Sequence, residues 1–152
     1  MPAVGKSGDH NPPMIAYRTS VENLQPEEIG EGFFEGWPNP PSREDHLRIL
    51  KGSFAVVLAE DQEKVVGFIT AISDGVSCAY IPHLEVLPAY RGHGIGSQLV
   101  TRLREQLKDL YMIDLLCDDP VKPFYKSLGF REVGGMAVRN YDRQSCQPNA
   151  IS

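Results

Sequence analysis

The most regular pattern of apolar and polar positions lies between residues 94 and 110. Large apolar side chains recur there every three or four residues, at Ile95, Leu99, Leu103, Leu107 and Leu110. This spacing places them on one face of a helix and leaves the polar residues on the other. The pattern predicts a long amphipathic helix over residues 94–110.

Shorter apolar runs, rich in β-branched residues, predict strands. The runs 54–60 and 64–73 are separated only by Asp61, Gln62 and Glu63, which is typical of a β-hairpin. Further strands are expected at residues 14–19, 77–87, 111–117 and 136–141.

Proline and capping residues predict the shorter helices. Pro26 suits the first position of a helix that begins near Gln25, and Ser42 caps a second helix over residues 43–50. A third helix is expected over residues 121–128. The resulting order of strand, two helices, three strands, helix, strand, helix and strand describes a mixed α/β domain built on one sheet.

Length and composition indicate one globular domain. The chain has 152 residues, 41% of them apolar, and no linker divides residues 13–142. Residues 1–12 and 143–152 are expected to be tails, the first of them mobile. The longest apolar runs, 54–59 and 65–72, are far shorter than the roughly 18 residues that cross a membrane. The first residues also lack the pattern of a secretory signal.

Cysteine usage and charge narrow the class further. Cys78, Cys117 and Cys146 are odd in number and widely spaced, which favours a reducing compartment, and we expect a cytoplasmic protein. The net charge of −5 with scattered Lys and Arg offers no basic patch for nucleic acid. That charge would steer a cationic substrate weakly, or it simply keeps the protein soluble.

The segment 84–100, LEVLPAYRGHGIGSQLV, carries the clearest chemical signal. A predicted strand ends there and a glycine-rich turn, 91–97, leads into the long helix. Gly92, Gly94 and Gly96 let the backbone approach a ligand closely and adopt conformations that are closed to other residues. The free N–H groups of Gly94, Gly96 and Ser97 at the helix start favour an anion such as a pyrophosphate.

The spacing in this turn excludes two phosphate-binding motifs. The Walker pattern needs a Lys and a Ser or Thr after its second Gly, and the dinucleotide fingerprint needs GxGxxG where this chain has GxGxG. Arg91 could add a charge-assisted contact to an anion. The alternative is a turn that only connects strand to helix.

Two motifs together resemble the GNAT superfamily of N-acetyltransferases. The run 91–96, RGHGIG, is similar to the acyl-CoA pyrophosphate loop Q/R-x-x-G-x-G/A of that family, and residues 84–88 resemble the strand that leads into it. About thirty residues later, FYKSLGF at 124–130 is similar to the family signature FYxxxGF. The resemblance covers about residues 14–141.

The resemblance implies a GNAT-like fold with a mixed, mostly antiparallel sheet, splayed between its fourth and fifth strands, and helices on both faces. Acetyl-CoA would be the cosubstrate, with its pantothenate arm in the opening and its thioester carbonyl polarised by the Val86 N–H. The residues expected to hold it are Leu84, Val86, Leu87, Arg91, Gly92, His93, Gly94, Ile95, Gly96, Ser97 and Phe124, although Phe124 also suits the core.

Tyr125 matches the family tyrosine that acts as general acid and protonates the leaving thiolate. The alternative is an aromatic residue that packs a helix on the sheet. For the general base, His83 and Glu85 differ by two positions in a strand, so both project from one face while Leu84 and Val86 fill the other. They are base candidates, or else a solvent-facing pair.

The aromatic residues of the proline-rich loop 32–41 concern the acceptor. Phe33, Phe34 and Trp37 would wall the acceptor pocket, as this loop commonly does in the family, or they pack in the core. Asp118 and Asp119 stand where many relatives have a cofactor-binding Asn, and helix capping suits them better.

The four histidines, His10, His46, His83 and His93, lack ligand spacing, so no metal site is predicted. Cys117 lies near the expected sulfur channel and suits the core. The expected activity is transfer of acetyl from acetyl-CoA to a primary amine of a small molecule or peptide. Alternatives are another acyl group, an alcohol acceptor, or a non-catalytic acyl-CoA-binding module. Family members often dimerise, so a homodimer is a further expectation.

Overall fold

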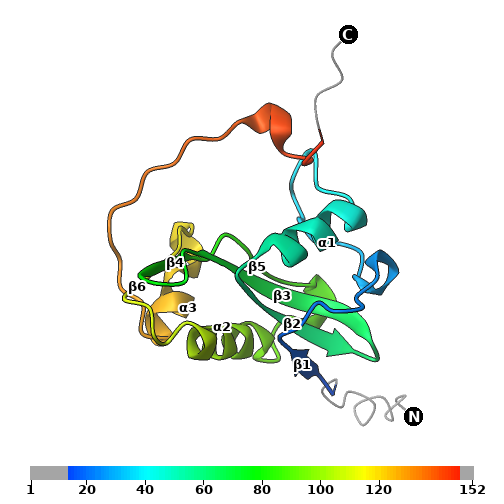
Figure 1. Ribbon diagram of the computed structural model, residues 1–152, viewed down its shortest axis with the longest axis horizontal. Helices are drawn as coiled ribbons and strands as arrows, with labels where there is room; N and C mark the ends of the chain where they lie inside the picture. Colours follow the sequence, from blue (N-terminus) through cyan, green and yellow to red (C-terminus); the bar gives the residue numbers. More distant parts are fainter. Residues whose placement is uncertain (1–13, 148–152) are drawn as a thin grey trace, which may run out of the picture.

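Within residues 14–147, which the computed structural model describes, one six-stranded sheet carries helices on both faces (Figure 1). The strands are β1 (Ala16–Arg18), β2 (Ala55–Asp61), β3 (Lys64–Ser73), β4 (Cys78–Tyr80), β5 (Leu84–Val86) and β6 (Met112–Asp114). The helices are α1 (Arg43–Gly52), α2 (Ile95–Gln106) and α3 (Lys122–Ser127), and 3₁₀ turns lie at Pro26–Glu28, Pro88–Tyr90, Asp119–Val121 and Tyr141–Arg143. The mixed, mostly antiparallel fold predicted from the sequence is confirmed.

The expected tails are only partly described. Residues 1–12 and 148–152 lie outside the described residues. The stretch 143–147 is described, and it contacts the loop before α1, where the Gln144 Oε1 accepts a hydrogen bond from the Asn39 N–H at 2.9 Å.

The β2–β3 hairpin forms the centre of the sheet, as its apolar runs predict. Gln62 and Glu63 have φ angles of 49° and 67°, the left-handed conformations that a two-residue hairpin turn requires. The two strands pair antiparallel from this turn to Ala55 opposite Ala71, with one irregularity between Ala59 and Glu60. Both strands are buried along most of their length because helices cover both faces, which explains their continuous apolar runs.

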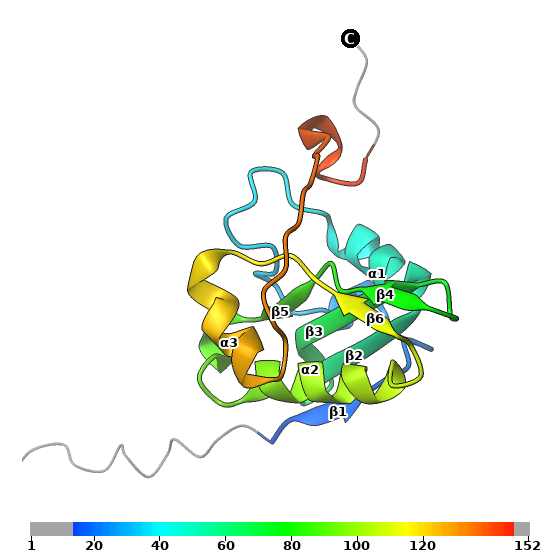
Figure 2. The same ribbon diagram turned by 90° about the vertical axis from the view of Figure 1, so that its left-hand side faces the viewer.

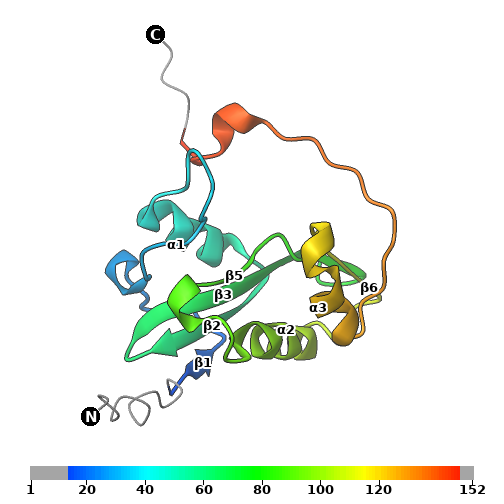
Figure 3. The ribbon, with the colours of Figure 1, turned by 180° about the vertical axis from the view of Figure 1, so that it is seen from behind.

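Helices α2 and α1 cover opposite faces of the sheet (Figures 2 and 3). The apolar face of α2 is buried against β2 and β3, as its periodicity predicts. On the other face, Leu47 and Leu50 of α1 pack in a cluster with Phe68 of β3. Ser42 caps α1 as expected, its Oγ accepting the Asp45 N–H at 3.1 Å.

The sheet splays where the fourth predicted strand meets the fifth. Residues 77–87 form two strands, β4 and β5, because Pro82 has no N–H with which to continue a ladder. The pairing of β4 with β6 ends where the Ile81 N–H donates to the Asp114 carbonyl at 2.9 Å. β5 pairs with β3 alone among the described strands. The backbone on its other side therefore faces the opening toward β6, which confirms the predicted splay.

The helix predicted near Gln25 begins where expected, with Pro26 at its first position, but it is only one turn long. Pro26–Glu28 form a single 3₁₀ turn, because Ile29 is already extended and makes a parallel bridge to Val65 of β3. The chain is drawn back to the sheet before a second helical turn can form.

The strand predicted at 136–141 is also wrong. Residues 131–140 are extended, but they belong to no strand of the described sheet. Arg131, Glu132, Val133 and Gly135 still line a cavity with residues 113–117, and a Cβ on Gly135 would lie 2.5 Å from Leu116 Cδ2. Beyond them, Figure 1 shows the chain, in orange, arching away from the sheet before it returns near the loop that precedes α1. The sequence pattern suits a strand, but a strand also needs a neighbour to pair with.

Candidate active site at the splayed strands

The glycine-rich turn between β5 and α2 has the backbone conformation that its sequence predicts. Gly92 and Gly94 have φ angles of 84° and 78°, a left-handed region that favours glycine. A Cβ at either position would meet no atom within 4 Å. The backbone angles, rather than lack of space, therefore select glycine, and the outer surface of the turn is open.

The first turn of α2 is open to an anion. The helix begins at Ile95 with Gly94 as its N-cap residue, and no side chain caps it. Its first N–H groups therefore lack helical partners and carry the positive end of the helix dipole. Ile95 itself is buried, so it can offer an anion only its backbone. The predicted pyrophosphate loop thus has the amides and the space that a phosphate group needs.

Gly96 and Phe124 have a packing role. A Cβ on Gly96 would lie 3.5 Å from the Phe124 ring, so the two residues join the start of α2 to α3. Phe124 lies in the cluster that α2 forms with the sheet. His93 is exposed and Ser97 is half-buried at the edge of the turn.

Arg91 joins the turn to the loop 32–41, which carries Phe33, Phe34 and Trp37 and which we call the aromatic loop. Its Nε donates to the Val86 carbonyl at 3.1 Å, and its Nη2 lies 3.2 Å from an oxygen of Glu35. More than half of the Arg91 side chain is exposed. Its guanidinium can therefore reach an anion at the turn by leaving a solvent-exposed ion pair, which costs little.

The backbone of β5 has one free side. The Leu87 N–H donates to a β3 carbonyl at 2.9 Å, and the His83 carbonyl accepts from a β3 N–H at 3.1 Å. Because backbone groups alternate in an antiparallel pair, those of Leu84 and Val86 point away from β3. They face the opening toward β6, where an extended ligand could pair with them, although the Val86 carbonyl is already bonded to Arg91 Nε. The Leu87 N–H is occupied within the sheet.

The side chains of β5 divide between the two faces of the sheet. Leu84 and Val86 pack in the α2 cluster, whereas Glu85 and His83 lie on the other face against the aromatic loop. Glu85 Oε1 accepts the Phe34 N–H at 2.7 Å. The predicted division of faces is confirmed.

The aromatic loop has a buried part and an accessible part. Phe34 is 3% exposed and belongs to the α1-side core, and Phe33 packs against that core. Trp37 is 38% exposed, and its ring centre lies 4.9 Å from that of Phe34 and 6.2 Å from that of His83. Of the three predicted acceptor-pocket residues, Trp37 is the most exposed and Phe33 is partly exposed.

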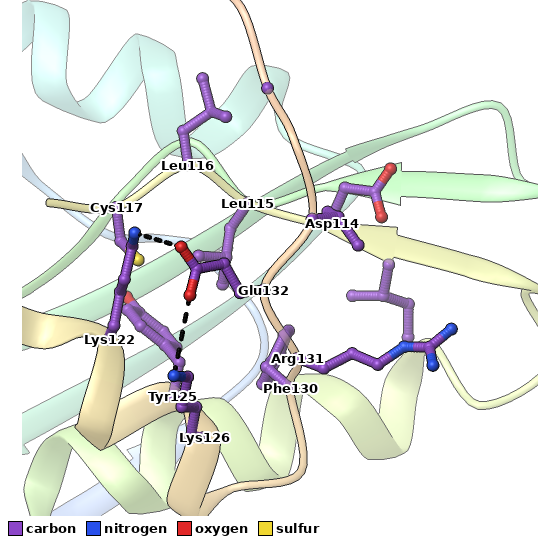
Figure 4. Close-up of a pocket in the computed structure, with 13 residues that line it drawn as sticks. Asp114, Leu115, Leu116, Cys117, Lys122, Tyr125, Lys126, Phe130, Arg131 and Glu132 are labelled. Carbon is purple, nitrogen blue, oxygen red and sulfur yellow. Dashed lines mark hydrogen bonds and ion pairs between the residues drawn. The ribbon is translucent and has the colours of Figure 1, made fainter. Parts of the chain in front are cut away.

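Tyr125 lines a cavity of about 260 Å³ beside the end of β6 (Figure 4). The cavity also includes the Cys117 thiol and is bordered by Glu132, which pairs with Lys122 at 2.6 Å and Lys126 at 3.7 Å. The Tyr125 ring packs edge-on against Phe130. The predicted general acid thus stands at a cavity, with its ring held by packing.

Comparison with known proteins places these features in a family. The model of the Acetyltransferase (GNAT) family matches residues 22–130. This chain belongs to the GNAT family. The motifs quoted from 91–96 and 124–130 both lie inside the match.

Three individual relatives, all named as acetyltransferases, are similar to this chain. A candidate acetyltransferase from Deinococcus radiodurans R1, known from its crystal structure, is 46% identical to this chain and matches its structure with a TM-score of 0.85. The match covers 89% of this chain and 94% of the Deinococcus chain. A GNAT-family acetyltransferase from Streptococcus pneumoniae TIGR4 is 30% identical to this chain, with a TM-score of 0.69. The match covers 84% of this chain and 98% of the Streptococcus chain. The chloroplastic GCN5-related N-acetyltransferase 3 of Arabidopsis thaliana is 40% identical over 78 residues, 50% of this chain and 33% of its own length.

One of these relatives has a stated cellular location. The chain spans about a third of the Arabidopsis protein, and that relative is chloroplastic, so a cytoplasmic location stays a prediction. Among residues 14–147, no helix has both the length and the apolar character to cross a membrane.

Burial sets the protonation behaviour of the GNAT chain's candidate base. Burial raises the pKa of Glu85, and the Phe34 N–H and the Arg91 charge oppose this rise only in part. Burial lowers the pKa of His83. Glu85 is therefore a stronger base than a surface carboxylate, and His83 favours its neutral form.

Burial acts on Tyr125 in the same way. It raises the pKa of Tyr125 to about 12, and the nearby Cys117 adds to the rise. The phenol therefore keeps its proton throughout the neutral range.

His46 is the residue of this region whose importance the sequence did not indicate. It is 2% exposed, its ring centre lies 4.4 Å from that of Phe68, and its Nε2 is buried without a partner among the described residues. Burial, with His83 nearby, lowers its pKa to about 4. A lone histidine in an apolar helix face gives no signal for this in the sequence.

The remaining predictions concern Asp118, Asp119 and metal ligands. No side-chain hydrogen bond caps the turn at Asp118, so the expected capping is not seen there, and Asp119 forms an ion pair with Lys122 at 2.7 Å. Within 14–147, the described part of the chain, no three His, Cys, Asp or Glu side chains gather as a metal site. His10 lies outside that part.

Proposed function

We propose that this GNAT chain transfers the acetyl group of acetyl-CoA directly to a primary amine of a small molecule or peptide. The observation that carries the proposal is the arrangement of β5. Its backbone groups at Leu84 and Val86 face the opening toward β6, where the Val86 carbonyl accepts a hydrogen bond from Arg91 Nε, while Glu85 faces the aromatic loop. One short strand thus presents a surface for an extended cosubstrate and a base for the acceptor.

The turn and β5 suit the two ends of acetyl-CoA. The uncapped amides at the start of α2 would bind the pyrophosphate, with Arg91 adding charge. The backbone groups of Leu84 and Val86 would pair with the pantothenate arm. The Val86 N–H would then donate to the thioester oxygen as negative charge develops on it, an interaction worth about 3–4 kcal/mol of barrier in comparable sites.

Glu85 is the proposed base. An attacking amine must lose a proton, and a partly buried carboxylate with a raised pKa takes up a proton more readily than an exposed one. His83, one step along the same face, can accept or relay that proton in its neutral form. Trp37 gives this face an aromatic surface suited to a cationic or apolar acceptor.

Tyr125 is the proposed acid. As the carbon–sulfur bond breaks, the phenol would donate its proton to the leaving thiolate. Its pKa of about 12 makes it a weak acid in its buried surroundings. The same burial also raises the pKa of a thiol that leaves into this cavity, which brings donor and acceptor closer in strength.

A thiol-release assay with acetyl-CoA and a panel of amines and peptides tests the proposal. The native protein is compared with Tyr125→Phe and, as a matched control, with Tyr141→Phe at a position that is 74% exposed. We expect turnover with at least one amine, a loss of about 100-fold or more in Tyr125→Phe, and no change in the control. Binding of acetyl-CoA without turnover on any acceptor would favour an acyl-CoA-binding module instead.

A further inference from the structure

A second cavity lies at the base of the aromatic loop. It is lined by residues 29–34, where the chain enters the loop, and by residues 41–43 with His46, where the loop leads into α1. Its volume is about 160 Å³, whereas a single water needs only about 10–15 Å³ of such space. It shares no lining residue with the cavity beside Tyr125. The two ends of the aromatic loop therefore enclose a space of their own, large enough for a small ligand.

The most buried polar side chain of this lining is His46. It is 2% exposed, and its Nε2 has no hydrogen-bond partner among the described residues. Because burial lowers the pKa of His46 to about 4, the ring is uncharged at neutral pH and has one N–H to donate. A buried polar atom without a partner is costly, and such atoms in proteins are normally satisfied by a protein group, a water or a ligand. His46 therefore indicates an occupant of the cavity that it lines.

The first turn of α1 brings unpaired backbone donors to the same place. The Asp45 N–H is taken by the Ser42 Oγ, and the His46 N–H donates to the Ser42 carbonyl at 2.8 Å. Within the described part of the chain, the N–H groups of Arg43 and Glu44 have no such partner. They belong to the positive end of a ten-residue helix. This end of α1 therefore favours an anion.

The charged side chains at the cavity leave Arg43 available to an anion. Arg43 and Glu31 both line the cavity and form an ion pair at 2.7 Å, with the Glu31 side chain 85% exposed. An exposed pair of this kind contributes little stability, so Glu31 can turn into solvent. The guanidinium also has five N–H donors and can serve a carboxylate and a second anion together. The buried acid of this turn, Asp45, is already paired with Arg48 at 2.6 Å.

We propose that this cavity binds a small oxyanion, either a carboxylate or inorganic phosphate, between the aromatic loop and the start of α1. The anion would accept hydrogen bonds from the Arg43 guanidinium, from the free N–H groups of the first helical turn and from the Nε2–H of His46. Charged and backbone donors of these kinds are the ones that bind carboxylate and phosphate oxygens in proteins. The site is distinct from the glycine-rich turn before α2, and the inference does not depend on the proposed acetyl transfer.

An anion bound here would fasten both ends of the aromatic loop. One end reaches the site at residues 30–34 and the other at residues 41–43. Phe34 lines the cavity, and its N–H donates to Glu85 Oε1 at 2.7 Å on the other side. Occupancy of the site should therefore hold Phe34, and with it the contact to Glu85, more firmly in place. The anion would act as a ligand that stabilises the loop rather than as a reactant.

Nuclear magnetic resonance of the histidine side chains in the full chain tests the site directly. The His46 ring signals are identified by their absence in His46→Phe, and the native protein is titrated with sodium phosphate and, separately, with sodium acetate, each at constant ionic strength. At least one of these anions should shift the His46 signals saturably and raise the unfolding temperature, whereas sodium chloride should not. Arg43→Gln should weaken this binding by about 10-fold or more. Lys51→Gln, which removes a positive charge from the last turn of the same helix, is the matched control and should bind as the native protein does.

A further variant separates this site from the glycine-rich turn, which also suits phosphate. Phosphate bound only at that turn would leave the His46 signals unmoved and would be weakened by Arg91→Gln rather than by Arg43→Gln, and this result would overturn the proposal. The proposal would also fail if neither anion shifts the His46 signals, or if Arg43→Gln binds as tightly as the native protein. Tighter binding of phosphate than of acetate would support the proposal with phosphate as the preferred ligand, and the reverse order would support it with a carboxylate. None of these measurements requires turnover of acetyl-CoA.

Discussion

Replacing Glu85 with Gln separates the chemistry of this residue from its structural role. Glu85 Oε1 accepts the Phe34 N–H at 2.7 Å, and Phe34 has a φ of 62°, so this bond helps to hold a strained backbone. The Gln amide oxygen can accept the same bond, because the two side chains have the same shape. Only the charge and the ability to take a proton are removed.

The expected change in stability is small. A hydrogen bond to a charged group contributes about 1.5–3 kcal/mol and one between neutral groups about 0.5–1.5 kcal/mol, so the substitution loses about 1 kcal/mol there. Removing a partly buried charge acts in the opposite direction. The free energy of unfolding at pH 7 should therefore stay within about 1 kcal/mol of the native value. Glu85→Ala should lose about 1–3 kcal/mol, since the Phe34 N–H is left without its acceptor.

The pH dependence of stability has a definite sign. Burial raises the pKa of folded Glu85, so the folded state holds its proton more tightly than the unfolded state does. The native protein should lose stability relative to Glu85→Gln as the pH rises from the ordinary carboxyl range through the raised pKa, and the difference should be constant above it. Urea denaturation at a series of pH values measures this.

The expected change in activity is large. If Glu85 takes the amine proton, kcat/KM should fall by about 100- to 10,000-fold in Glu85→Gln, and the acidic limb of the pH profile should disappear. Glu105→Gln, an exposed carboxylate on α2, is the matched control. A Glu85→Gln variant that folds normally and keeps kcat/KM within about threefold would refute the base assignment, because losses of 100-fold are expected for such a role.

Two further predictions concern the core around this site. Gly30→Ala should destabilise the protein by about 2–4 kcal/mol and lower the unfolding temperature by about 5–15 °C, because the new Cβ would lie 2.7 Å from the Val65 carbonyl oxygen. The control Gly52→Ala, whose Cβ would have no atom within 4 Å, should change the free energy of unfolding by no more than about 1 kcal/mol. Equal unfolding temperatures for the two variants in thermal melts would contradict this prediction. Unfolding frees His46 to take a proton near pH 6.5 while the folded pKa is about 4, so the native protein should lose on the order of 3 kcal/mol as the pH falls across that interval. His46→Phe should lack this slope in acid titrations of stability, and an unchanged slope would contradict the assignment.

The sequence predicted those features that depend on neighbours a few residues away. The repeat from Ile95 to Leu107 identified α2, Ser42 identified the start of α1, and the gap between two apolar runs identified the β2–β3 hairpin. Gly92 and Gly94 indicated left-handed backbone at the turn. Each of these depends on local periodicity or backbone angles, which a few consecutive residues determine.

Features that depend on distant segments were decided only in the folded chain. Pro26 marks a helix start, yet the bridge from Ile29 to Val65, 36 positions later in the chain, ends the turn at once. The run 136–141 has a strand pattern, but it pairs with no strand of the described sheet. Pairing depends on which backbone groups meet in space, and local pattern contains no such information.

The chemistry of the site divides in the same way. The sequence by itself determined the residue types and their alternation along β5, so His83 and Glu85 could be assigned to one face. Only the tertiary structure brought Phe34 against Glu85 and packed His46 of α1 against Phe68 of β3. Burial and hydrogen bonds made by segments far apart in the chain set the pKa values of these groups, because desolvation depends on everything packed around a side chain.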